Sequence, residues 1–227
     1  MPKCINKKLI ESLCDKSHIQ DHLDIDILLF IMDKSQRLRD GVLKAYSEAA
    51  DNPLHEHPFP VGLHFAEELG YPQDLLLSIP TVSVEVFSGV SNVSLFASIP
   101  PGATVLDLGC GAGMDSLIAA RRTGVGGKVI GIDFSRTMIS RARQAATEAG
   151  VGNVEFRIAD AEELPVDSGF IDVAIVNGIF NLNPRRDDIF RELARVVRPG
   201  GSVYAAELIL KGTLPPDILD SEPDWFA

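Results

Sequence analysis

A glycine-rich segment carries the strongest chemical signal in the sequence. Residues 107–113 read Asp-Leu-Gly-Cys-Gly-Ala-Gly, directly after a short apolar run and directly before a helical pattern. Glycines let the chain turn sharply and let a ligand approach the backbone, and the positive end of the following helix would point at that ligand. Many nucleotide-binding folds share such a turn. The spacing G-x-G-x-G after an acid differs from the G-x-G-x-x-G of nicotinamide-binding folds.

Three further polar residues follow at the ends of predicted strands. Asp133 lies 20 residues beyond Gly113, where an acid can accept both hydroxyls of a ribose. Asp160 follows the third strand and could accept an adenine amino group, and Asn177 ends the fourth strand. Singly, Asp107 and Asp133 could cap helices, and Asp160 could be a turn residue. Together they favour a ligand crevice, because open α/β sheets bind ligands at the carboxyl ends of their strands.

The elements that must position these residues alternate between strand and helix from residue 104 onward. Five apolar runs predict strands, and the segments between them predict helices that end at glycine or proline. Strands are expected over 104–108, 128–132, 154–158, 171–176 and 202–210, with helices over 115–123, 136–149 and 187–197. Such alternation implies right-handed crossovers and a parallel sheet covered on both faces. Residues 101–227 therefore predict an α/β domain with a doubly wound, mostly parallel sheet.

Residues 1–100 are rich in charged and turn-forming residues and poor in strand-like runs. They are predicted to form a helical N-terminal extension or lid. Helical spacing over 25–50 predicts a helix in two pieces, and short helices are expected over 66–70, 73–79 and 90–98. Residues 52–62 contain three prolines and are expected to be irregular. His55, His57 and His64 occur here without a cysteine or H-E-x-x-H spacing. We therefore expect no metal, and interpret these histidines as part of a loop or of a wall that contacts substrate.

The composition excludes several classes of protein. The 227 residues are 45% hydrophobic and 23% charged, which suits a globular domain with an ample core. The net charge of -11 repels phosphate backbones, so nucleic acid is not an expected partner. Three cysteines (Cys4, Cys14 and Cys110) provide no disulfide framework and fit a reducing compartment. Without a signal peptide or a bilayer-spanning run, the expectation is a cytoplasmic protein with no membrane contact.

Residues 103–210 resemble class I S-adenosylmethionine-dependent methyltransferases. The matching stretches are VLDLGCGAG (105–113), VIGID (129–133), ADAEELP (159–165) and RVVRPGGSVY (195–204). A finer similarity, to arsenite methyltransferases and their relatives, lies in LGYPQDLLLSIP (69–80), NGIFNLNP (177–184) and LPPDILDSEPDWF (214–226). The resemblance implies a Rossmann-like sheet, S-adenosylmethionine as cofactor and a small-molecule methyl acceptor.

The resemblance assigns the glycine-rich turn to the methionine end of the cofactor. The residues that would hold this end and lie close to the cofactor are Asp107, Gly109, Gly111 and Gly113. Cys110 lies in the same turn and belongs to the predicted cofactor site. A buried cysteine at such a place also packs as a small hydrophobe.

The resemblance assigns the later strand ends to the adenosine and the methyl group. Asp133 would bind the ribose, and Phe134 would flank the adenine. Asp160 and Ala161 would contact the adenine edge, and Asn177 would line the site of methyl transfer.

The similarity to arsenite methyltransferases is incomplete at the residues that would bind arsenic. Those enzymes use cysteine thiolates, because a soft ligand suits a soft centre. The family cysteine after the strand-four asparagine is Gly178 here, and residues 50–69 contain no cysteine. Three functions stay open: direct methyl displacement onto a small molecule, arsenite methylation by an atypical route, and cofactor binding without catalysis. No catalytic residue is predicted, since no general base stands out.

The last predicted strand raises the question of what covers the edge of the sheet. Only 17 residues follow Leu210, and three of them are prolines, too few for a further helix and hairpin. We expect a shortened C-terminal sheet edge, unless the chain is truncated. Because an open edge strand attracts pairing, the expected cover is a second copy in a homodimer or the N-terminal segment.

Overall fold

The computed structural model describes residues 22–209, with side chains from Ser35 onward. Cys4, Cys14 and the stretch at 214–226 lie outside the described residues. The chain divides into two units between Arg37 and Leu38. Apart from residues 22–37, which form the first part of a long helix, the features that follow belong to the second unit, which contains the sheet.

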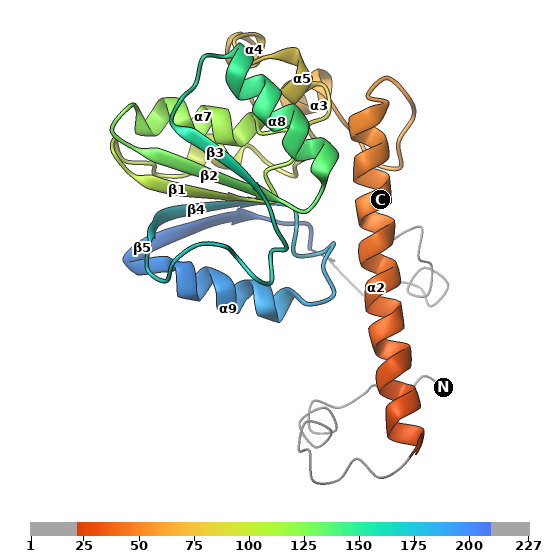
Figure 1. The fold of residues 1–227 in the computed structure, drawn as a ribbon. Coiled ribbons are helices and arrows are strands. Elements are labelled where there is room, and N and C mark those ends of the chain that lie inside the picture. The colour runs from red at the N-terminus through yellow and green to blue at the C-terminus, as the bar shows by residue number, and fades with distance from the viewer. Residues whose placement is uncertain (1–21, 210–227) are drawn as a thin grey trace. The chain divides into compact units, whose positions relative to one another are not determined.

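Five parallel strands form the sheet in the described part of the chain (Figure 1). Their order is β3-β2-β1-β4-β5, so successive strands run outward from β1 in one direction and then in the other. This reversal beside β1 is the switch point at which doubly wound sheets bind ligands. The five predicted strands are present, with bounds β1 Thr104–Leu108, β2 Lys128–Asp133, β3 Val154–Ile158, β4 Ile171–Asn177 and β5 Val197–Ala206. The bounds predicted for the fifth, 202–210, were wrong, because the strand begins before Pro199 and ends at Ala206.

Helices cover both faces of the sheet, as the doubly wound prediction requires. Helices α7 (Met114–Thr123) and α8 (Arg136–Glu148) pack on one face, and α9 (Arg186–Val196) packs on the other (Figure 1). Side chains of β1 alternate between these layers, since Val105 packs in the cluster that contains α7 residues and Leu106 in the cluster that contains α9 residues. Alternation of this kind is the geometric property of a strand, and here it fixes Asp107 on the α7 face.

The N-terminal region is helical, as predicted, but its longest helix is continuous rather than in two pieces. The helices are α2 His22–Asp51, α3 Leu63–Glu68, α4 Gln73–Leu77, α5 Thr81–Val84 and α6 Val93–Phe96, of which α5 was not expected. Tyr71 and Leu76 join a buried cluster with Leu117 of α7 and Ile139 of α8. No helix within residues 22–209 is both long and apolar enough to cross a bilayer. The division of function at residue 100, into lid and cofactor-binding domain, stays a prediction.

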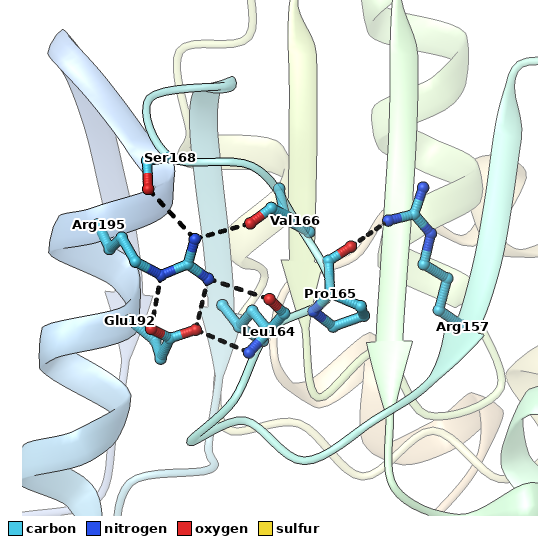
Figure 2. Close-up of polar contacts among 7 residues, drawn as sticks. All are labelled: Arg157, Leu164, Pro165, Val166, Ser168, Glu192 and Arg195. Carbon is cyan, nitrogen blue, oxygen red and sulfur yellow. Dashed lines mark hydrogen bonds and ion pairs between the residues drawn. The ribbon is translucent and has the colours of Figure 1, made fainter.

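A group of hydrogen bonds fastens the loop after β3 to helix α9 (Figure 2). Arg195 donates to the carbonyls of Leu164 at 3.0 Å and Val166 at 2.8 Å. It also pairs with Glu192, at 2.6 Å between Nη2 and Oε2. Glu192 in turn accepts a hydrogen bond from the N–H of Leu164 at 2.7 Å. Because this loop begins at Asp160, these contacts help to fix a residue that the sequence assigns to the ligand.

Replacing Arg195 tests how much this fastening stabilises the fold. Arg195→Ala leaves the carbonyls of Leu164 and Val166 without this donor and removes the cationic partner of Glu192, which costs about 1–3 kcal/mol. We expect the melting temperature to fall by several degrees, at roughly 2–4 °C per kcal/mol for a chain of this size. The matched control is Arg191→Ala, because Arg191 pairs with Asp188 on the surface of the same helix. Equal melting temperatures for the two variants would show that the loop does not depend on Arg195.

Candidate functional site

A single cavity gathers most of the residues that the sequence singles out. It is open to solvent, and the space between its walls, including that opening, is about 1110 Å³. The predicted residues that line it are Asp107, Gly109, Cys110, Gly111, Asp133, Phe134, Asp160, Ala161 and Asn177. The tenth, Gly113, does not line the cavity and instead begins helix α7 in the left-handed conformation, with φ 84°.

Hydrogen bonds to strand β2 hold the glycine turn in place. The N–H groups of Gly109 and Cys110 both donate to the carbonyl of Ile132, at 2.8 and 3.0 Å. At Gly109 the backbone has φ 75°, and a Cβ would lie 2.3 Å from Cγ2 of Ile179. A side chain would therefore strain the turn and collide with the wall of the cavity. The bare backbone leaves a cradle that a ligand can approach closely.

Asp107 is a buried carboxylate at the floor of the cavity. Burial raises its pKa, the nearby Asp115 carboxylate adds to that effect, and a hydrogen bond from the Ser116 hydroxyl opposes it. That hydroxyl donates to Oδ2 at 2.5 Å. The Ser116 backbone also stabilises the carboxylate, but two donors do not fill its acceptor capacity, in a place where an unsatisfied charge is costly. A cationic group such as an ammonium fits this position.

Asp133 links strand β2 to the glycine turn. Its Oδ2 accepts a hydrogen bond from the N–H of Gly111 at 2.9 Å, and its Oδ1 accepts one from the N–H of Ser135 at 2.8 Å. Burial raises the pKa of Asp133 to about 6, although these backbone donors pull it down. Each carboxylate oxygen can accept a further hydrogen bond. The two oxygens of Asp133 therefore suit the two hydroxyls of a ribose.

Asn177 lines the cavity, but its amide group is engaged within the protein. Its Oδ1 accepts hydrogen bonds from the N–H groups of Val90 and Ser91, at 2.9 and 3.2 Å. Its Nδ2 donates to the carbonyl of Ser91 at 2.7 Å and to Asp115 Oδ2 at 2.9 Å. Asn177 therefore fixes Val90 and Ser91, which directly follow the cavity-lining residues Ser88 and Gly89.

Asp115 is a site residue that the sequence reasoning missed. It lines the cavity and is buried, and burial raises its pKa. It accepts hydrogen bonds from Tyr71 at 2.6 Å, from Ser94 and from Asn177. An acid in the first turn of α7, directly after the glycine turn, was the available sequence signal. Its partners come from distant segments, which no local pattern reveals.

Helix α2 also contributes residues that were not predicted. Arg39, Val42 and Tyr46 line the cavity at helical spacing. Arg39 forms ion pairs with Asp160 and with Glu162, whose side chain is 4% exposed. The guanidinium thus binds directly to a residue assigned to the adenine.

The position after Asn177 cannot carry a side chain without strain. Gly178 has φ 79°, and a Cβ there would lie 3.0 Å from Cγ1 of Val90. A cysteine at this place would require both the left-handed backbone and displacement of Val90. Cys110, which does line the cavity, is buried, and burial raises the pKa of its thiol. The described residues therefore hold no set of converging thiolates.

The histidines of the N-terminal region do not gather into a metal site in the described part of the chain. His57 donates a hydrogen bond to the carbonyl of Asn52 at 3.0 Å and stacks on Phe59. His64 is exposed beside Glu67 and Glu68, and His55 is exposed. Among residues 35–209, no three His, Cys, Asp or Glu side chains are grouped closely enough to ligate a metal. The role of these histidines in substrate contact stays a prediction.

Known proteins resemble this chain in both sequence and fold. A family described as a methyltransferase domain matches residues 99–225. An arsenite methyltransferase of Halobacterium salinarum is 38% identical over 159 residues, which cover 70% of this chain and 40% of that protein. A demethylmenaquinone methyltransferase of Lactococcus lactis is 35% identical over 106 residues, covering 47% of this chain and 42% of that protein. The chain thus spans less than half the length of either relative.

A solved structure supports the same relationship. The arsenic(III) S-adenosylmethionine methyltransferase of Chlamydomonas reinhardtii superposes with a TM-score of 0.60 and 28% identity, over 68% of this chain and 56% of that one. Because the family match covers more than half of its residues, the chain belongs to the methyltransferase domain family, as a class I S-adenosylmethionine-dependent member with a Rossmann-like fold, related to arsenite methyltransferases.

Proposed function

We propose that this chain transfers a methyl group from S-adenosylmethionine to a small-molecule acceptor. The observation that carries the proposal is the meeting of Asp107, Asp133 and Asp160, from the ends of three neighbouring strands, in one cavity beside bare glycine backbone. Each group has chemistry that suits a different part of the cofactor. The net charge of -11 supports an acceptor other than nucleic acid.

The methionine end of the cofactor fits the glycine turn. The Asp107 carboxylate would bind the ammonium group, and this pairing would relieve the cost of burying the carboxylate. Gly109 and Gly111 line the cavity without side chains, so the cofactor could lie against their backbone. The N-terminus of α7 beyond Gly113 adds a positive end to the same region.

The adenosine fits the ends of β2 and β3. Asp133 would accept hydrogen bonds from both ribose hydroxyls, and the Phe134 ring would flank the adenine. Asp160 and Ala161 would meet the adenine edge, where a carboxylate can accept a bond from the amino group. Both residues line the same cavity as Asp133.

The protein's part in the reaction is alignment and the exclusion of water. When bound, S-adenosylmethionine would supply a sulfonium methyl group for attack by the acceptor nucleophile, with S-adenosylhomocysteine as the leaving group. Val42, Phe87 and Ile179 give the cavity apolar walls, which favour a reaction that disperses charge. Asn177, through its bonds to Val90 and Ser91, holds the wall next to the methyl-transfer region and so orients the acceptor.

The acceptor is better explained as an ordinary small molecule than as thiolate-bound arsenite. The relative from Halobacterium is named an arsenite methyltransferase, but Gly178 offers no thiolate and Val90 occupies the adjoining space. A relative named for demethylmenaquinone indicates that similar domains occur with an organic acceptor. A turnover screen with radiolabelled cofactor against arsenite, thiols, quinols and small amines tests the class. Intact cofactor binding with no transfer to any of them would favour a non-catalytic role.

Binding of S-adenosylhomocysteine, measured by calorimetry, tests the cofactor site. We expect micromolar affinity for the wild type, and at least about tenfold weaker binding for Asp107→Asn and Asp133→Asn, since each loses a charge-assisted contact worth about 1.4 kcal/mol or more. Asp74→Asn is the matched control, because Asp74 is exposed on α4. Preference for NADH, or equal affinity in all four proteins, would refute the assignment.

The ligand-free protein should become more stable as the pH falls from 7.5 toward 6. Burial raises the pKa of Asp107, and that of Asp133 to about 6, so the folded state binds protons that the unfolded state still lacks. Glu155, Asp172 and Glu192 have lowered pKa values, and their contributions are lost only below this range. Melting temperatures across the range measure the effect. It should shrink in Asp107→Asn, and an undiminished rise in that variant would exclude Asp107 as its source.

A further inference from the structure

We propose that Arg39 is a positioning residue that fastens the C-terminal part of helix α2 over the adenine end of the cavity by holding Asp160 and Glu162. The inference rests on the proposed function in one respect, namely that Asp160 contacts the adenine. The ion pairs themselves are independent of any ligand.

The burial of Glu162 gives these contacts their strength. Its side chain is 4% exposed, and Arg39 Nη1 lies 3.3 Å from its Oε1. A buried carboxylate whose cationic partner is removed is strongly destabilised. The same guanidinium reaches Asp160 with Nη2, although Asp160 is half exposed. One arginine thus bridges two carboxylates of the same loop, a geometry that the single charged nitrogen of lysine does not reproduce.

The rest of helix α2 shows why this bridge acts as a latch. Val42 and Tyr46 follow Arg39 along the stripe that lines the cavity. Near the end of the helix, Ala50 packs in a buried cluster with Met138, and the Ser47 hydroxyl lies 3.1 Å from that of Ser135. The end of the helix is therefore fixed by packing. Arg39 is a polar attachment at the other end of this stripe.

The bridge also orients the group proposed to meet the cofactor. Arg39 binds Oδ1 of Asp160, and among residues 35–209 it is the only partner of that carboxylate. Oδ2 is then left to accept a bond from the ligand. The loop is fixed on its other side by Arg195, through the carbonyls of Leu164 and Val166. Two arginines from different helices thus hold the segment that begins at Asp160.

A latch of this kind should slow the escape of the cofactor. Without Arg39, Asp160 loses its orientation and helix α2 loses its attachment, so a bound adenosine should leave faster. We expect Arg39→Gln to raise the dissociation rate of S-adenosylhomocysteine about tenfold, which by itself would raise Kd tenfold. Arg39→Lys should recover only part of the loss. Glu162→Gln, which keeps the shape and removes the charge, should weaken retention in the same direction.

Stopped-flow kinetics and hydrogen–deuterium exchange on the full chain together test the latch. Exchange is measured without ligand, in the peptides that contain residues 38–51 and 159–163. Arg39→Gln should exchange faster in both peptides, and Lys44→Gln, which removes an exposed charge from the same helix, should match the wild type. If Arg39→Gln does not fold, the same comparison is made with the milder variants Arg39→Lys and Glu162→Gln.

The outcomes separate this inference from the proposed function. Faster exchange in both peptides together with faster dissociation supports the latch. Unchanged exchange overturns it, and so does tighter binding by Arg39→Gln, since that would mean that Arg39 competes with the ligand for Asp160. If the wild type binds no S-adenosylhomocysteine, the proposed function fails, and the exchange of the ligand-free variants alone decides the latch.

Discussion

The carboxyl end of strand β2 provides the contacts on which the rest of the site depends. The carbonyl of Ile132 and the carboxylate of Asp133 together accept three hydrogen bonds from the backbone of the glycine turn, at Gly109, Cys110 and Gly111. This is possible because β1 and β2 are parallel and in register, with Leu108 beside Ile132. A slip of one residue would reverse the faces of the strand. Sheet register is thus what brings the acids and the bare backbone to one cavity.

The walls of the cavity come from segments that are far apart in the sequence. Hydrogen bonds and ion pairs join these segments to one another. Asp115 and Asn177 hold the segment around Ser91, and Gly89 must lack a side chain because a Cβ there would lie 2.4 Å from the Asn177 amide nitrogen. Across the cavity, Arg39 binds the loop after β3. The N-terminal helices therefore complete the site instead of merely flanking it, and their polar contacts bear on how the cavity admits its ligand.

The strands and the floor of the site could be predicted because their signals are local. Apolar runs followed by a glycine, an aspartate or an asparagine mark the ends of the first four strands, and topology brings those ends together. The walls could not be predicted. Asp115 is indistinguishable from an ordinary acid at a helix start, and Arg39 from any exposed arginine of an amphipathic helix, until the partners are known. Asn177 was predicted as a lining residue, yet its bonds to Val90 and Ser91 depend on a segment 86 residues away.

The buried carboxylate of Asp107 has a consequence for the lifetime of the protein. A buried carboxylate without a full set of partners lowers the stability of the ligand-free protein. A cationic ligand that binds there would stabilise the folded state by mass action. Cofactor supply would then govern how much of the chain survives proteolysis as well as how fast it works. If the chain binds the methyl donor as proposed, a shortage of that donor would also lower the amount of folded protein.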